Sequence, residues 1–305
     1  MPDGGPVNEI ASIAPGPASG CSLAPPRADL PIPTYESHSS LSTYRECPLR
    51  YAFRYVEHVP GEERPDQYAF GSGIHHAFEV FVRERIRADR TGGRTPGADL
   101  LWAALDESLA GSGLSPDAVE EARLRARPAL ELFLANEEAR AVEPVAVEIG
   151  FGITVRPPGL DDGIRFVGYI DRVDRSANGD IEILDYKTGR LRDQADVDAD
   201  RQLTAYAFAA ARGALRDPAT GDPLPAASRL GLYFADVGVT IWTSRDTAAL
   251  GAFEADLVRT VERIRRRDFP ARPAEWRCRW CEYGNACGQS ALAPSPRDTA
   301  PGGVA

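Results

Sequence analysis

Lysine is almost absent from this sequence of 305 residues. Lys187 is the single lysine among 35 basic residues, and the other 34 are arginine. Arginine stays protonated, whereas the pKa of a lysine is easily shifted by its surroundings. A chain that uses arginine for every other cation is expected to keep lysine where only lysine works, although chance survival in an arginine-rich sequence is the competing explanation.

Long apolar runs and a secretory start are also absent. No run of about 18 apolar residues occurs, which excludes a membrane-spanning helix. The first residues lack a basic patch followed by an apolar stretch, so we expect no signal peptide and a cytoplasmic location. The formal net charge of −10 excludes a polycation that coats nucleic acid. It does not exclude a local basic groove, because local field and net charge are different quantities.

Cysteine is scarce, with five residues at positions 21, 47, 278, 281 and 287. The odd number and the missing signal peptide argue against a disulfide framework. Three of them form the pattern Cys278-x2-Cys281-x5-Cys287, which indicates ligation. Together with Cys47, four thiolates can bind zinc or an iron–sulfur cluster, and the residues alone do not separate the two.

The N-terminal half is predicted to contain a tail followed by helices. Residues 1–33, rich in Pro, Gly, Ala and Ser, and residues 291–305 are predicted to be disordered tails around one domain at 34–290. Ser39 or Ser40 is predicted to cap a helix over 41–59, with a break at Cys47-Pro48. A Gly-rich turn at 71–73 is predicted to open a second helix over 74–89. Two more helices are predicted over 98–111 and 116–141.

The period then changes to that of strands. Strands are predicted over 145–155, 164–175 and 180–187, and the Ser-Ala-Asn-Gly turn at 176–179 makes the last two a hairpin. A helix over 201–215, strands near 229–235 and 238–243, and a helix over 246–268 follow. This order predicts an α/β fold in which a mixed sheet is flanked by helices.

The hairpin gathers two carboxylates and the lysine. Asp185 and Lys187 share one face of their strand because side chains alternate. Counting back from the Asn178-Gly179 turn places Asp171 roughly opposite them. Carboxylates this close repel each other unless a cation joins them, and a few hard oxygen ligands suit Mg²⁺ or Mn²⁺. An exposed Asp–Lys ion pair on an edge strand is the simpler interpretation of the DYK triplet alone.

Four segments that contain these residues resemble the PD-(D/E)XK nuclease superfamily in its RecB-like branch. They are GSGIHHAFE at 71–79, GYIDRVDR at 168–175, ILDYKTG at 183–189 and QLTAY at 202–206. They follow the order of the family and cover most of residues 35–288. The resemblance implies a restriction-endonuclease-like core that hydrolyses DNA with Mg²⁺ or Mn²⁺.

Site roles follow from the resemblance, residue by residue. It implies that His75, Asp171 and Asp185 are metal ligands, that the backbone carbonyl of Tyr186 is a further ligand, and that Lys187 is the catalytic lysine. Asp171 and Asp185 are thereby catalytic as well.

The last of the four segments adds two residues near DNA. Gln202 and Tyr206 match the Q-x3-Y motif, which in this family lies next to the active site and DNA. They are neighbours on one helix face. The sequence leaves the roles of Glu79 and Glu148 open, and it leaves open whether the arginines of the last helix and those near Cys47 hold phosphates or form solvated ion pairs.

The cysteine spacing also resembles a known pattern. One distant Cys47 followed by Cys278, Cys281 and Cys287 looks like the iron–sulfur staple of RecB-like nucleases such as the AddB-type subunits. The resemblance implies a 4Fe–4S cluster that joins the N-terminal helices to the C-terminal segment, with zinc as the alternative.

The sequence therefore predicts a metal-dependent DNA nuclease, expected to be a RecB-like exonuclease that acts on single-stranded DNA or DNA ends in repair, recombination or foreign-DNA processing. The residues do not separate exonuclease from endonuclease cleavage. The chain has no Walker A motif, so a helicase or repair partner is a hypothesis. Two other functions stay open, a non-catalytic DNA-binding module and a zinc-stabilised adaptor.

Overall fold

The computed structural model describes residues 26–62, 65–158 and 162–292. Cys21 and most of the two predicted tails lie outside these ranges. The chain divides into two compact units, one at 26–272 and a second whose described part is 273–292. Residues 26–33 contain no helix or strand, but Leu30 and Ile32 pack against the core of the larger unit. The predicted domain limits at 34 and 290 stay predictions.

A six-stranded mixed sheet forms the centre of the larger unit. Its main path runs β1 (Tyr35–Ser37), β3 (Ile164–Ser176), β4 (Ile181–Lys187), β5 (Ala227–Phe234) and β6 (Val239–Thr243). The long strand β2 (Val142–Val155) pairs with the edge of β3 opposite to the one that β1 and β4 occupy. β1 with β3 and β4 with β5 are parallel, and the remaining pairs are antiparallel. The predicted α/β fold with a mixed central sheet is confirmed, although the sequence did not predict β1.

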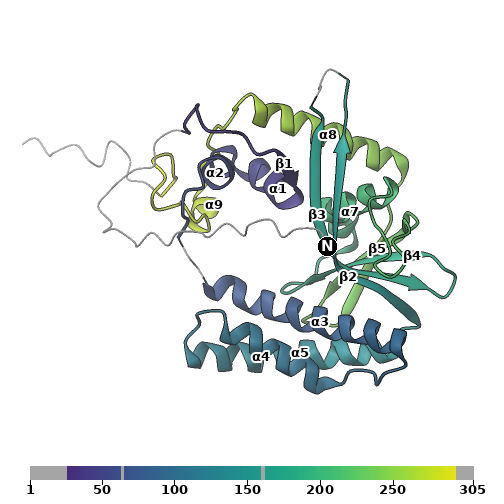
Figure 1. Cartoon of the computed structure of the whole chain (residues 1–305). Coiled ribbons are helices and arrows are strands. Elements are labelled where there is room, and N and C mark those ends of the chain that lie inside the picture. Colours follow the sequence, from purple (N-terminus) through teal and green to yellow (C-terminus); the bar gives the residue numbers. More distant parts are fainter. Residues whose placement is uncertain (1–25, 63–64, 159–161, 293–305) are drawn as a thin grey trace, which may run out of the picture. The chain divides into compact units, whose positions relative to one another are not determined.

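Helices cover both faces of this sheet. On one face α3 (Pro65–Thr91), α4 (Ala98–Ala110) and α5 (Pro116–Ala139) pack together, and their apolar residues form one core with Leu184, Tyr186 and Tyr233 (Figure 1). On the other face α7 (Arg201–Ala211) and α8 (Thr247–Arg265) bury side chains with Ile183 and other strand residues. A short helix that was not predicted, α6 (Gln194–Asp198), precedes α7.

The first helix begins earlier than predicted. α1 (His38–Glu46) is capped by Ser37, whose side chain accepts from the backbone N–H of Ser40, while the Ser40 hydroxyl accepts from Ser37 N–H. The expected cap at Ser39 or Ser40 is therefore wrong, because Ser40 completes a reciprocal capping box from the third helical position. After the break at Cys47, α2 (Pro48–Tyr51) leads into a π-helical turn, η1 (Ala52–Val56).

The Gly-rich turn predicted at 71–73 is also wrong, because these residues lie inside α3. A Cβ added at Gly71 would lie 3.1 Å from Thr188 Oγ1, and one added at Gly73 would lie 3.0 Å from Leu105 Cδ1. The two glycines thus let the helix approach the end of β4 and α4 closely. Tertiary contact overrides the low helix propensity of glycine here.

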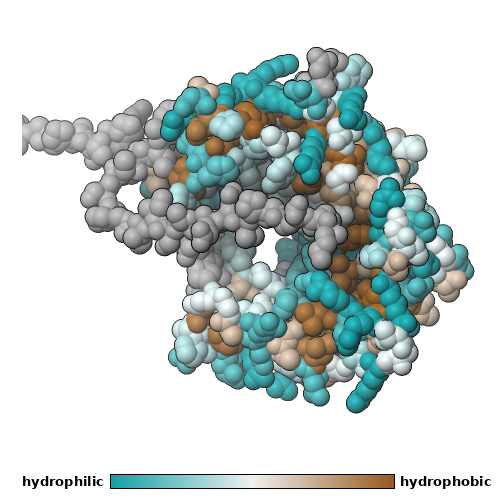
Figure 2. All heavy atoms as spheres, in the orientation of Figure 1, coloured by the Kyte–Doolittle hydropathy of each residue, from teal (hydrophilic) through white to brown (hydrophobic). Residues whose placement is uncertain are grey.

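The second unit contains the short helix α9 (Glu275–Arg279) and a series of turns. A Cβ at Gly284 would lie only 2.1 Å from the carbonyl oxygen of Cys278, so the turn requires glycine at this position. Among the described residues no helix has the length and apolarity needed to cross a membrane. Figure 2 shows hydrophilic side chains over much of one face, with apolar side chains gathered in several patches among them.

Candidate active site

Asp171 and Asp185 lie across from each other on β3 and β4. The ladder pairs Arg172 with Leu184 and Val173 with Ile183, so the next step places Asp171 opposite Asp185. Asp185 is 1% exposed. Asp171 Oδ2 accepts a hydrogen bond from the backbone N–H of Tyr186 at 2.9 Å. The two carboxylates are therefore neighbours on one face of the hairpin.

Lys187 belongs to a closed ring of four polar side chains, which we call the Lys187 ring: Asp185, Lys187, Gln202 and Tyr206. Lys187 Nζ lies 2.5 Å from Asp185 Oδ2 and donates to Gln202 Oε1 at 2.8 Å. Gln202 Nε2 donates to the Tyr206 hydroxyl at 2.7 Å, and that hydroxyl donates to Asp185 Oδ1 at 3.0 Å. Burial and the charge of Asp185 hold the pKa of Tyr206 well above its usual value, so the hydroxyl keeps the proton that it donates.

His75 approaches the same carboxylates from α3. Its Nδ1 lies 3.3 Å from Asp171 Oδ2, and its ring packs edge-on against Tyr186 with centroids 5.9 Å apart. Burial lowers the pKa of His75, although the charge of Asp185 and the backbone of Tyr186 act in the opposite direction. The neighbouring His76 lies instead 3.8 Å from Glu79. Of the two adjacent histidines, His75 is thus the one at the carboxylates, and its neutral ring can donate a lone pair.

The two carboxylates cannot both be ionised here without more positive charge than Lys187 supplies. Burial raises the pKa of Asp171 to about 8, and the charge of Asp185 adds to this effect. Lys187 is the close cation, and His75 is neutral. A bound divalent cation would relieve the repulsion between the carboxylates.

The donor atoms at the site fit a hard cation. Asp185 Oδ2 is buried and accepts no hydrogen bond of ordinary geometry, although Lys187 Nζ is close. Carboxylate oxygens together with an imidazole nitrogen suit Mg²⁺ or Mn²⁺. Within the ranges that the structure describes, no three His, Cys, Asp or Glu side chains are gathered tightly enough to form a recognisable metal site.

Glu148 is a further carboxylate beside this group. β2 pairs Val147 with Arg172 and Ile149 with Ile170, so Glu148 on β2 lies opposite Asp171 on β3. Its φ of 47° is uncommon for a residue other than glycine. Burial raises the pKa of Glu148, and the charge of Glu79 adds to this. Glu79 itself pairs with Arg83.

His38 is a residue near the site that sequence reasoning missed. It is the first residue of α1. Burial lowers its pKa to about 4, and the charges of Asp200, Arg45, Lys187 and Asp185 also act on it. Its ring is therefore neutral near pH 7. The sequence does contain a signal for it. Ser37 and Ser40 form a capping box, and the residue that follows the cap, His38, is the first residue of α1.

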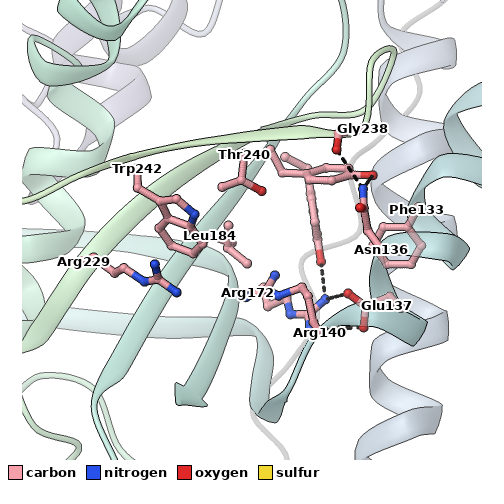
Figure 3. A pocket seen from close by; sticks show the side chains of 12 residues that line it. Phe133, Asn136, Glu137, Arg140, Arg172, Leu184, Arg229, Gly238, Thr240 and Trp242 are labelled. Carbon is pink, nitrogen blue, oxygen red and sulfur yellow. Dashed lines mark hydrogen bonds and ion pairs between the residues drawn. The ribbon is translucent and has the colours of Figure 1, made fainter. Parts of the chain in front are cut away.

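The reverse face of the same two strands carries a buried ionic network (Figure 3). Arg172 is wholly buried and donates to Glu137 at 2.5 Å and to Asp174 at 2.7 Å. Its Nη1 lies 3.5 Å from the Tyr186 hydroxyl. Burial acts to raise the pKa of Glu137, but the charges of Arg172, Arg140 and Arg85 together with the hydrogen bond from Arg172 outweigh it, and the pKa falls.

Arg172, Glu137 and Tyr186 line a cavity of about 250 Å³ on that face. Arg172 follows Asp171 in the chain, and Tyr186 lies between Asp185 and Lys187. The network therefore fixes the strands from behind.

The arginines of the last helix mostly have partners within the chain. Arg263 binds Asp268, Arg265 binds the carbonyl of Gly163, and Arg267 binds the carbonyls of Arg27 and Leu30. Arg265 and Arg267 thus tie segments together through backbone carbonyls, and Arg263 forms an ion pair.

The cysteines of the expected cluster belong to the two separate units. Cys47 ends α1, and its Sγ accepts from the backbone N–H of Arg272 at 3.5 Å. Cys278, Cys281 and Cys287 lie in and after α9. Burial acts to raise the pKa of Cys278, but hydrogen bonds from backbone N–H groups, that of Ala291 first, lower it overall. A lowered pKa favours the thiolate, which is the metal-binding form.

Comparison with known proteins gives one family. Curated protein sequences contain no match to the chain. Among solved structures, the crystal structure of SSO0001 is 16% identical, with 73% of this chain and 95% of that chain covered and a TM-score of 0.29. A TM-score at that level supports no functional inference. The PD-(D/E)XK nuclease superfamily matches residues 36–288, a range that includes His75, both aspartates and the Lys187 ring. The chain belongs to the PD-(D/E)XK nuclease superfamily.

Proposed function

We propose that this chain is a deoxyribonuclease that hydrolyses phosphodiester bonds with Mg²⁺ or Mn²⁺. The observation that carries the proposal is the Lys187 ring, with its lysine held beside two opposed carboxylates on a protein of the nuclease superfamily. His75, Asp171, Asp185 and the backbone carbonyl of Tyr186 would hold the ion. When bound, the ion would supply a water of lowered pKa and offset the charge of the phosphate.

The side chains of the ring have separable roles. Lys187 is 24% exposed at its side chain, so it reaches solvent while Asp185 and Gln202 hold its ammonium. It can orient the attacking water or stabilise the charge that develops on the phosphate. Arginine would be a poor proton-transfer partner because it does not readily deprotonate. Gln202 and Tyr206 position Lys187 and Asp185, so they act through those two residues.

The order of the four sequence motifs supports a RecB-like exonuclease that acts on single-stranded DNA or DNA ends. A helicase or repair protein as partner is part of this proposal. Affinity capture of the full chain that recovers no helicase or repair protein would argue against such a partner.

We also propose a 4Fe–4S cluster held by Cys47, Cys278, Cys281 and Cys287. Three thiols within ten residues, one of them with a lowered pKa, support metal ligation. Anaerobic purification should yield brown protein that contains iron and loses it in Cys281→Ser. Stoichiometric zinc without iron would favour the zinc-stabilised alternative instead.

The proposed activity is tested by incubating single-stranded DNA with Mn²⁺ and the purified full-length chain. Wild-type protein should cleave, and Lys187→Ala should lose about 10²–10⁴-fold in rate, the usual worth of a positioned acid–base group. Lys187→Arg should stay impaired because it keeps the charge but not the proton transfer. Arg87→Ala, an exposed arginine paired with Glu84, serves as the control. Binding without cleavage by the wild type would support a non-catalytic DNA-binding module, and equal cleavage by Lys187→Ala would refute the mechanism.

A further inference from the structure

A second pocket, distinct from the cavity of Figure 3, opens beside the Lys187 ring. It lies between the start of α1, the segment that follows β4, and the start of α7, and its volume is about 640 Å³. Gln202, which accepts a hydrogen bond from Lys187, forms part of its wall. The pocket therefore lies next to the Lys187 ring. The other residues that we use from its lining are His38, Arg190, Arg192, Asp200 and Arg201.

Arg190 is the arginine of this pocket that is available to bind an anion. Its side chain is exposed, and no ion pair or hydrogen bond to it is found in the part of the chain that the structure describes. Arg192, by contrast, lies 3.0 Å from Asp200. His38 adds no charge because its pKa is about 4. An unpaired guanidinium that lines an open pocket can bind an anion.

Positive charge continues from the pocket through Arg201. Three arginines from three helices, Arg45, Arg201 and Arg259, share the single carboxylate of Asp256. Burial and the charge of Arg201 lower the pKa of Arg45, and Arg45 Nε is buried without a hydrogen-bond partner. Three cations around one carboxylate leave an excess of positive charge, which a second anion would balance.

We propose that this pocket and the three arginines around Asp256 bind backbone phosphates of the DNA strand next to the phosphodiester that is cleaved, with Arg190 as a direct phosphate contact. The inference rests on the proposed nuclease function and adds the path of the substrate. A local excess of arginine on a chain of net charge −10 concentrates a polyanion at this place and leaves the rest of the surface repulsive.

The test uses Arg190→Ala in the full chain with Lys187→Ala, so that DNA is bound and not cut. Binding of a short fluorescein-labelled single-stranded oligonucleotide is measured by anisotropy between about 50 and 200 mM salt. Loss of one phosphate contact should reduce the slope of log K against log salt by about 0.7. Because this contribution vanishes near 1 M salt, it corresponds to about eightfold weaker binding at about 50 mM. Arg190→Lys should restore the slope, and Arg87→Ala, the exposed control on α3, should not change it.

Cleavage by the enzyme with intact Lys187 provides an independent readout. Arg190→Ala should raise KM and leave kcat nearly unchanged, since the contact is made equally in ground and transition states. If Arg190→Ala and Arg87→Ala bind DNA alike while the wild type cleaves, the phosphate path is refuted and the nuclease function stands. If the wild type neither binds nor cleaves DNA, both proposals fall.

Discussion

Removal of the Tyr206 hydroxyl should separate the positioning of Lys187 from the integrity of the fold. Tyr206 is 3% exposed, and its hydroxyl joins Gln202 to Asp185. Tyr206→Phe therefore takes one hydrogen bond from a buried carboxylate, which costs about 1.5–3 kcal/mol. For a domain of this size the melting temperature should fall by roughly 3–12 °C. The released Lys187 should also lower kcat by about 10–100-fold, or about 1.4–2.7 kcal/mol.

The matched control is Tyr233→Phe on the reverse face of the sheet. Tyr233 is also buried, and its hydroxyl accepts a longer, neutral hydrogen bond from Asn136 at 3.3 Å. Its loss should cost about 1 kcal/mol and leave kcat unchanged. Differential scanning fluorimetry and the Mn²⁺-dependent cleavage assay measure both effects. If Tyr206→Phe and Tyr233→Phe reduce kcat equally, the Lys187 ring does not position the lysine.

Three further predictions concern stability and metal content. Glu137→Gln removes one of the two carboxylates that pair with the wholly buried Arg172 and should cost about 3–5 kcal/mol in thermal unfolding, whereas Glu131→Gln on the exposed side of α5 should cost little. Burial raises the pKa of Glu36 above that of a free glutamate, so its contribution to stability is present below the free value and is lost as pH rises through the folded pKa. Glu36→Gln should therefore raise the melting temperature relative to wild type more at about pH 8 than at about pH 5. Gly284→Ala places a Cβ against the Cys278 carbonyl and should reduce the bound iron or zinc per chain, whereas Gly251→Ala, which has open space, should not.

The central hairpin is the part of the fold that the sequence predicts best. The Asn178-Gly179 turn fixes where β3 and β4 reverse, and strict alternation then determines which residues share a face. Counting from that turn is enough to bring Asp171 opposite Asp185, because no insertion shifts the register between them. Local turn chemistry and a period of two residues are both readable without tertiary information.

Contacts between distant segments explain what the sequence could not predict. β1 has only three residues, and it pairs with residues about 130 positions away, so no local pattern reveals this strand. Gly71 and Gly73 look like a turn because glycine usually ends helices, and the close approach of Thr188 and Leu105 that requires them is a tertiary fact. The closure of the Lys187 ring likewise depends on how α7 packs on the sheet.

Alternation along β3 and β4 assigns chemistry to one face and rigidity to the other. Asp171, Asp185 and Lys187 face the site, while Arg172 and Tyr186 face the buried network behind it. Charges inside such a network are costly to unpair, so its geometry resists small displacements. Substitutions behind the sheet should therefore reduce activity only where they also reduce stability. Substitutions in the Lys187 ring should reduce activity by far more than their loss of stability explains. The ratio of the two losses thus distinguishes a side chain that acts on the substrate from one that holds the strands.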